Sequence, residues 1–217
     1  MCCNSVIDRR FGHQVNHIIV GNLGNLEIVL MAYDDGDVIA YYTHAIARCI
    51  KGSGDHPRGA SACNTRPTTH VKPFFHDNVA LTAWGLAIHS QSRLIAVGSN
   101  YHEVTVFAFA VSRSNVAVPD TEEVVDDSPA VASGQTALEL EKHYRSRTRT
   151  WKITLPLGPS GHNVPNLDFV DDAIGEADKV AAIDIWGNVW LLDIWKVGSV
   201  PIQWQDDPGA GRGDMRG

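Results

Sequence analysis

Short runs of apolar residues, separated by turn-forming residues, dominate this sequence. Each run holds four to eight residues rich in Val, Ile, Leu and aromatic side chains and is cut by Gly, Asp, Asn or Ser, as is typical of β-strands. The runs fall into three groups, at residues 27–43, 84–110 and 164–195. In the first group, Asp35-Gly36 separates two runs and predicts a type I′ hairpin, because both central residues of that turn need positive φ.

The three groups share a degenerate repeat, in which a valine near the end of the group is followed three positions later by a large apolar residue. The pairs are Val38 and Tyr41, Val104 and Phe107, and Val189 and Leu192. Short strands that recur after tight turns are typical of stacked small antiparallel sheets. The first group keeps only two strands of the repeat, at 26–32 and 37–42.

This repeat resembles the blades of WD-repeat propellers, which open with a Gly-His pair and close the third strand with a Trp-Asp pair. Gly161-His162 matches the opening pair, and Leu192-Asp193 keeps the Asp of the closing pair. The sequence therefore predicts an all-β fold, a partial WD40-like β-propeller of about three blades of antiparallel strands with long loop insertions. A β-sandwich with similar hairpins is the alternative.

The stretches between the groups set the predicted domain organisation. Residues 1–16 are expected to form an N-terminal extension, 17–205 the propeller blades and 206–217 a Gly-rich disordered tail. Residues 51–80 and 112–150 are predicted loop insertions, and insertions of this length are unusual in a compact domain. The longest uncharged apolar stretches are strand-sized, far below the roughly 20 residues of a membrane span, and no secretory signal is visible.

Composition narrows the class of function. The 217 residues are 44% hydrophobic and 20% charged, which is ordinary for a globular protein. With 18 Lys and Arg against 25 Asp and Glu, the net charge is −7, so we do not expect direct nucleic-acid binding. Four cysteines do not make a disulfide scaffold, which favours a reducing compartment, the cytosol or the nucleus.

The densest positive charge lies near the end of the 112–150 insertion. The candidate contacts for a partner or a phosphate are Lys142, Arg145, Arg147, Arg149 and Trp151. The acidic residues within 120–127 are expected to neutralise this run inside the same loop. The alternation at 145, 147 and 149 also fits one solvated face of an edge strand that leads into 151–155.

No metal, cofactor or small-molecule substrate is expected. Structural zinc sites usually hold a ligand pair two to four residues apart, whereas the zinc-competent side chains here are spaced by seven residues: Cys49, His56, Cys63 and His70. The acidic run 34–37 lacks the spaced ligands of a calcium loop and is explained by turn formation. No nucleophile elbow or phosphate-binding loop occurs, so no catalytic residue is predicted.

Six phrases of the sequence resemble a fungal family of WD-repeat-like proteins, typified by a yeast regulator of ribonucleotide reductase gene transcription. They are residues 17–25, 32–38, 84–89, 102–107, 155–163 and 187–195. The resemblance implies a nuclear, non-enzymatic propeller protein that acts in control of ribonucleotide reductase expression and as a substrate-side adaptor of a cullin-type ubiquitin ligase. It brings no catalytic motif with it, and a cytoplasmic pool is also compatible with it.

The length of the chain leaves alternatives open. Members of the resembled family are several times longer, and a closed propeller needs at least about four blades, so we expect this chain to be part of a longer protein. The alternatives are a truncated gene product without independent function and, less favoured, a propeller-borne hydrolase. Because unclosed blades expose sheet faces and edges, we expect the isolated chain to be poorly soluble or to dimerise.

Overall fold

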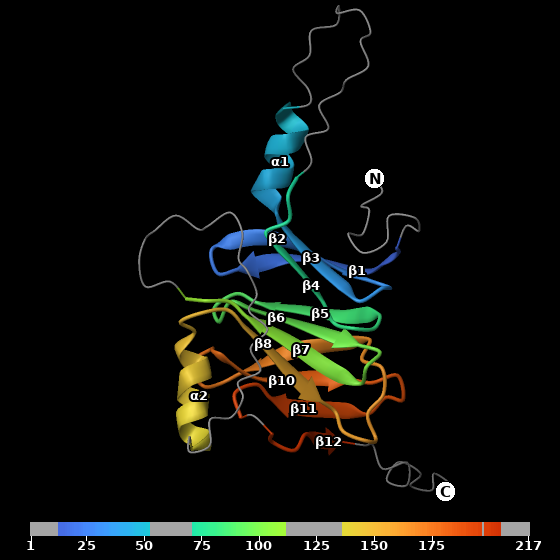
Figure 1. Cartoon of the computed structure of the whole chain (residues 1–217), viewed down its shortest axis with the longest axis vertical. Helices are drawn as coiled ribbons and strands as arrows, with labels where there is room; N and C mark the ends of the chain where they lie inside the picture. The colour runs from blue at the N-terminus through green and yellow to red at the C-terminus, as the bar shows by residue number, and fades with distance from the viewer. Residues whose placement is uncertain (1–12, 53–70, 112–135, 197, 205–217) are drawn as a thin grey trace, which may run out of the picture.

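Each of the three predicted groups supplies two or three strands of one four-stranded antiparallel sheet. The computed structural model describes residues 13–52, 71–111, 136–196 and 198–204. The three sheets are stacked one on the next, as Figure 1 shows. The all-β prediction is therefore confirmed, with the addition of two helices that the sequence pattern did not predict.

The sheets follow the order of the chain. Sheet A consists of β1 (Val15–Leu23), β2 (Leu26–Tyr33), β3 (Asp37–Tyr42) and β4 (Phe75–Asn78). Sheet B consists of β5 (Ala83–His89), β6 (Leu94–Ser99), β7 (Glu103–Ala108) and β8 (Trp151–Pro156). Sheet C consists of β9 (Asn166–Asp171), β10 (Ala177–Ile183), β11 (Val189–Asp193) and β12 (Ile202–Trp204). In each sheet the strands lie side by side in sequence order, so each sheet is a simple meander.

Each helix lies in the connection between the third and fourth strands of a sheet, α1 (Thr43–Gly52) in sheet A and α2 (Ala137–Ser146) in sheet B. Helix α1 follows β3 and projects beyond sheet A, and helix α2 lies along one side of sheets B and C (Figure 1). Thr136 caps α2: its hydroxyl accepts the Glu139 N–H, and the Glu139 carboxylate accepts the Thr136 N–H. This capping box is a local sequence signal for the start of a helix. The prediction of a loop over 112–150 is therefore wrong for the residues that form α2.

The predicted 51–80 loop is also wrong in part, because it contains β4. Only two adjacent apolar residues mark this strand, Phe74 and Phe75, and both are buried. Strand β1 likewise completes a sheet that was predicted to keep only two strands, and it begins inside the predicted 1–16 extension. The predicted tail at 206–217 and the acidic residues within 120–127 lie outside the described residues.

The predicted hairpin between β2 and β3 exists, but its turn is not of type I′. Three residues, 34–36, join the strands, and Gly36 alone among them has a positive φ, 87°. Its N–H donates to the Tyr33 carbonyl at 3.2 Å. A three-residue loop with glycine in the left-handed position is the other common way to connect right-twisted strands. A Cβ at Gly36 would also lie 2.5 Å from the Leu81 carbonyl oxygen, so only glycine fits.

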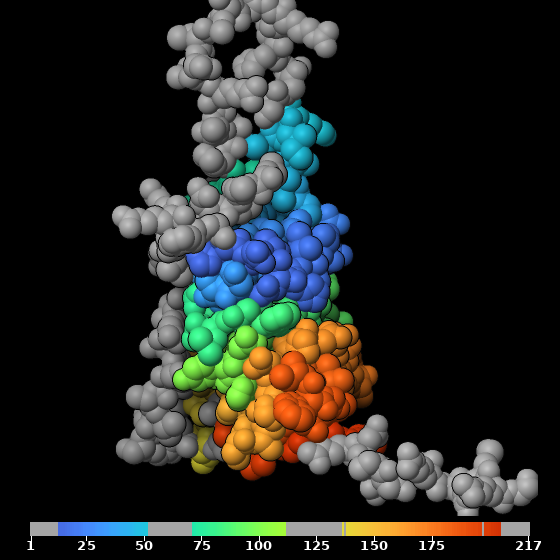
Figure 2. Space-filling model, turned by 90° about the vertical axis from the view of Figure 1, so that its right-hand side faces the viewer, coloured from blue at the N-terminus to red at the C-terminus, as the bar shows by residue number. Residues whose placement is uncertain are grey.

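Two apolar cores hold the three sheets together. One lies between sheets A and B and includes Leu30, Phe75 and Phe107, and the other lies between sheets B and C and includes Val106 and Val180. The first strands of successive sheets are neighbours, because β5 contacts both β1 and β9. Figure 2 shows the resulting layers in sequence, from β1 to β3 of sheet A in blue, through β5 to β7 of sheet B in green, to sheet C in orange and red.

Candidate interaction surface

The face of sheet C that points away from sheet B carries two rows of exposed or half-exposed apolar side chains. Its other face is packed into the core, because Val180, Ala182, Trp190 and Leu192 are buried there. Successive residues of a strand point to opposite faces, so the intervening positions face outward. They form two rows across the strands: Ile183, Val189 and Trp204, then Ala181, Leu191 and Ile202.

These outward rows form an apolar centre with a charged border, here called the sheet C outer face. Trp204 is 70% exposed and Ile202 is 63% exposed. Lys179 and Asp193 are paired across the strands on the same face, and Asp168 lies opposite Ala181. Contiguous exposed apolar side chains with a polar rim are characteristic of protein–protein interfaces. The arrangement can therefore bury apolar area against another protein.

A hairpin turn holds this face in shape. The Asp184 carboxylate is buried in the turn between β10 and β11 and accepts hydrogen bonds from the Trp186 and Asn188 N–H groups and from the Trp190 indole N–H, at 2.9–3.0 Å. Burial by itself raises the pKa of this carboxyl, but the hydrogen bonds from Asn188, Trp190 and Trp186 outweigh it and lower the pKa. The ionised form of Asp184 is therefore favoured, and its carboxylate accepts the hydrogen bonds that fix the turn.

Sheet A also has an apolar outer face. Ile18, Met31 and Ile39 are in register across β1, β2 and β3, on the face opposite the core shared with sheet B. Ile18 is exposed, whereas Met31 and Ile39 are buried in a small separate cluster. The stack thus ends in an apolar sheet face on both sides. Dimerisation of the isolated chain through such faces stays a prediction.

The residues of the basic run that were predicted to contact a partner or a phosphate differ in exposure and in ion pairing. Lys142 is exposed on α2. Arg145 is paired with Glu141 at 3.0 Å on the same helix and with Asp178 at 2.8 Å on β10. The acidic partners of this arginine therefore come from α2 and from sheet C.

Arg147 and Arg149 follow the end of α2. Arg147 adopts the left-handed conformation of a helix C-cap, with φ 42°, and its guanidinium donates to the Ser92 carbonyl and lies 4.0 Å from Glu176. Burial lowers the pKa of Arg147, Glu176 opposes this effect, and the nearby Arg93 adds to it. Arg149 lies over the Trp151 ring, 4.1 Å from its centroid, and Trp151 is 1% exposed.

The alternating solvated face predicted for 145–149 is thus wrong, because helix α2 runs to Ser146 and its cap turns the chain at Arg147. Strand β8, in contrast, is the edge strand of sheet B as predicted. A partner or phosphate contact by these residues stays a prediction. Two of the arginines already have carboxylate partners within the described residues, which reduces the positive charge that they offer to a ligand.

A group of polar side chains, here called the polar belt, joins sheets B and C. His89 Nε2 lies 2.9 Å from an Asp171 oxygen, the Ser92 hydroxyl donates to Glu176, and the same hydroxyl accepts the Ala177 N–H at 2.8 Å. The Ser92 hydroxyl is directed to Glu176 and not to His89, and Ser92 is 1% exposed. This group therefore lacks the nucleophile–base contact of a hydrolytic triad and acts as a structural link.

A groove lies between α2, β8 and the segment after β11. It encloses about 210 Å³ and is lined in part by Leu140, Tyr144, Leu155, Leu192 and Lys196. Small-molecule sites usually measure about 300–1,000 Å³.

Of the four zinc-competent residues, only Cys49 lies in the described part of the chain, on α1, and the other three are outside it.

Sequence reasoning missed the main part of the sheet C outer face. Strand β12 was not predicted, although residues 200–204 alternate apolar and polar side chains in a strand-like pattern.

Trp84 and Trp186 are exposed, while Trp190, Trp195 and Phe107 are buried. Neither described helix is long and apolar enough to cross a membrane.

Comparison with known proteins identifies the family. A search of curated proteins found no match to this sequence. The model of the CRT10 family matches residues 6–211, which includes every described strand and both helices. A match over nearly the whole chain means that this protein belongs to the CRT10 family.

Proposed function

We propose that this chain is a protein-interaction module of a regulator of ribonucleotide reductase gene transcription. The single observation that carries the proposal is the match of the CRT10 family over residues 6–211. It agrees with the resemblance of six phrases of the sequence to a family typified by such a regulator. The proposal assigns no catalytic step to the chain.

The proposal includes a propeller-type architecture. Each sheet is a four-stranded meander, and the first strands of successive sheets are neighbours, as expected for adjoining blades around an axis. The middle sheet, B, packs on both sides, as a blade inside a propeller does. The apolar outer faces of sheets A and C fit the two ends of such an arc.

The sheet C outer face is the surface proposed to contact a partner protein. Trp204 and Ile202 supply the exposed apolar centre, and large aromatic side chains contribute strongly to binding energy at protein interfaces. Lys179 and Asp193 lie at the border of this centre and form part of its polar rim. The proposed partner, taken from the resemblance, is a subunit of a cullin-type ubiquitin ligase, and the proposed site of action is the nucleus.

A deletion and complementation experiment tests the regulatory role. Deleting the gene in the organism that encodes it should change the level of ribonucleotide reductase transcripts, and the unaltered gene should restore it. Unchanged transcripts after deletion would overturn the regulatory role and favour a product without independent function.

A surface variant tests the assigned face. The double substitution Ile202→Ser and Trp204→Ser should fail to restore the transcript level at equal protein abundance. Tyr101→Ser is the matched control, because Tyr101 is 59% exposed in a turn of sheet B. Affinity purification of the tagged protein should recover a cullin-ligase subunit with the control and not with the double variant. Equal recovery with both would exclude the sheet C outer face as the contact.

A further inference from the structure

A histidine and two aspartates meet at one end of sheet A. His13 lies just before β1, and Asp34 and Asp35 lie in the hairpin turn between β2 and β3. His13 Nδ1 forms a hydrogen bond with Asp34 Oδ1 at 3.1 Å and lies 3.6 Å from Asp35 Oδ2. One ligand atom from each of the three side chains lies within 4.8 Å of the other two. This is the only such group of potential metal ligands in the part of the chain that the structure describes.

The three side chains are fixed by their surroundings. The Gln14 N–H donates to Asp34 Oδ1, and the Asp34 N–H donates to the Gln14 carbonyl, so the chain before β1 is tied to the turn. The Asp37 N–H donates to Asp35 Oδ1 at 3.1 Å, which turns Asp35 Oδ2 toward His13. Ligands that are already in place lose little conformational freedom when an ion binds.

One oxygen of this group receives no hydrogen bond within the described part of the chain. Asp35 Oδ2 is buried and accepts no hydrogen bond from any described residue, since 3.6 Å to the imidazole is too long. A buried carboxylate oxygen without a donor or a cation is unfavourable. A metal at about 2.0–2.2 Å from each ligand places neighbouring ligand atoms about 3.0–3.6 Å apart, close to the separations between His13 Nδ1 and the two carboxylates.

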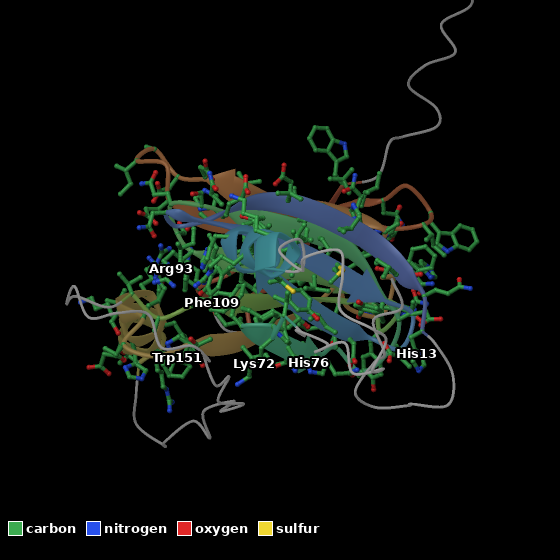
Figure 3. The ribbon with its side chains drawn as sticks, turned by 90° about the horizontal axis from the view of Figure 1, so that it is seen from above. His13, Lys72, His76, Arg93, Phe109 and Trp151 are labelled. Carbon is green, nitrogen blue, oxygen red and sulfur yellow. The ribbon has the colours of Figure 1, made fainter. Side chains whose placement is uncertain are left out.

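We propose that His13, Asp34 and Asp35 bind one divalent transition-metal ion, of the class of Zn²⁺, Co²⁺ or Mn²⁺. Imidazole nitrogen with carboxylate oxygen suits these ions, and solvent completes the coordination because Asp34 is 42% exposed. The ion joins the start of β1 to the β2–β3 hairpin and so has a structural role. The three side chains lie at the opposite end from Arg93 and Trp151, as Figure 3 shows. They belong to sheet A, whereas the proposed partner surface is on sheet C.

The surroundings of His13 limit the expected metal affinity of the site. In metal sites the second nitrogen of a histidine ligand usually donates to a carboxylate or carbonyl, which strengthens binding. His13 Nε2 is buried and has no hydrogen-bond partner among the described residues. We therefore expect moderate affinity, below that of a closed structural zinc site.

A titration of the metal-free full chain tests the proposal. Co²⁺ added to the protein should give visible ligand-field absorption that saturates at one ion per chain, and Zn²⁺ should displace it. His13→Gln and Asp35→Asn should each weaken Co²⁺ binding about 10- to 100-fold. His76→Gln is the matched control, since His76 pairs with Asp37 at 3.1 Å and belongs to no such group, and it should bind as the unaltered chain does.

Circular dichroism spectra of the variants, recorded without metal, verify that each one folds. Absence of Co²⁺ absorption in the unaltered chain would overturn the proposal, as would equal binding by folded His13→Gln and His76→Gln. An ion-dependent rise in melting temperature, seen with the unaltered chain and absent in both ligand variants, would support it. The transcript measurements above do not depend on this result, so the two proposals fail separately.

Discussion

The junction between sheets A and B differs from the junction between sheets B and C in the kind of side-chain contact that joins the two sheets. At the first, aromatic rings supply most of the packing: Phe75 packs edge-on against Phe107 and Phe109, with centroids 4.9 and 5.4 Å apart. One ion pair, Lys152 of β8 with Asp77 of β4 at 2.8 Å, is added to this packing. At the second, an apolar core is supplemented by the polar belt, in which the Ser92 hydroxyl donates to Glu176. Arg147 lies beside the belt and contacts both residues. Apolar packing is non-directional, whereas hydrogen bonds require one alignment of donor and acceptor.

This difference indicates what each junction is sensitive to. Loss of volume should dominate at the A–B junction, because a closely packed core leaves a cavity where a ring is removed. Loss of a single hydrogen-bonding atom should matter at the B–C junction, because its partners are left buried and unsatisfied. Charge should also matter there, since Arg145 and Asp178 connect α2 to sheet C.

Removal of an aromatic ring from the A–B junction should have the largest effect. Phe107 is fully buried between the two sheets, so Phe107→Ala should lower the free energy of unfolding by about 3–5 kcal/mol. Urea denaturation measures this value. Tyr101→Ala, at an exposed position of the same sheet, should change it by less than about 0.5 kcal/mol. Equal losses in both variants would contradict the assignment of the A–B core.

Removal of one hydroxyl from the B–C junction should have the next largest effect. Ser92→Ala leaves the buried Ala177 N–H without its acceptor and removes the hydroxyl donor of Glu176 Oε2, which should cost about 1–3 kcal/mol. Chemical denaturation of the variant gives the value. A loss below the error of the measurement would show that the polar belt does not hold sheets B and C together.

Acid should weaken the B–C junction through Asp178. The hydrogen bond from Lys179 lowers the pKa of this carboxyl, burial opposes the effect, and the hydrogen bond from Arg145 adds to it. Because the folded-state pKa is below the unfolded value of about 3.9, the stabilisation is fully present above about pH 4 and is lost as the pH falls through the folded value. Asp178→Asn should cost about 1 kcal/mol at neutral pH, since the group is partly exposed.

The difference between Asp178→Asn and the unaltered chain should therefore shrink as the pH is lowered to about 3. Urea denaturation at a series of pH values measures this difference, and comparison with the variant removes the contribution of the other carboxyl groups. A difference that stays constant with pH would show that Asp178 does not contribute through its charge.

An exposed hydroxyl at the A–B junction should have the smallest effect. The Ser90 hydroxyl donates to the Gly24 carbonyl at 3.0 Å across sheets A and B, but both groups are accessible to water. Ser90→Ala should therefore change stability by less than about 0.5 kcal/mol, and it is the direct counterpart of Ser92→Ala. Similar losses from the two serine variants in parallel denaturation curves would remove the contrast between the junctions.

The sequence allowed the prediction of elements whose signals are local and apolar. The three groups of strands, the hairpin at Asp35-Gly36 and the edge strand that begins at Trp151 follow from alternation and turn residues. Strand β4 was missed because Phe74 and Phe75 are too short an apolar run to stand out. Helix α2 was missed although its capping box, Thr136 with Glu139, is present in the sequence.

The candidate sites were less predictable, because their residues come from distant parts of the chain. The basic run appeared continuous in sequence, yet its arginines are held by Asp178 and Glu176, about 30 residues further along. The sheet C outer face depends on the pairing of Trp204 with Val189. His13 and Asp35 are brought together only when β1 pairs with β2.

The sequence by itself determined that this protein is built of short antiparallel strands in three groups, because apolar periodicity and turn residues act over a few positions. Only the tertiary structure decided which apolar side chains are buried between sheets and which remain on the sheet C outer face, and which charges neutralise each other. These outcomes depend on the register and stacking of whole sheets, where a shift by one residue exchanges the two faces of a strand.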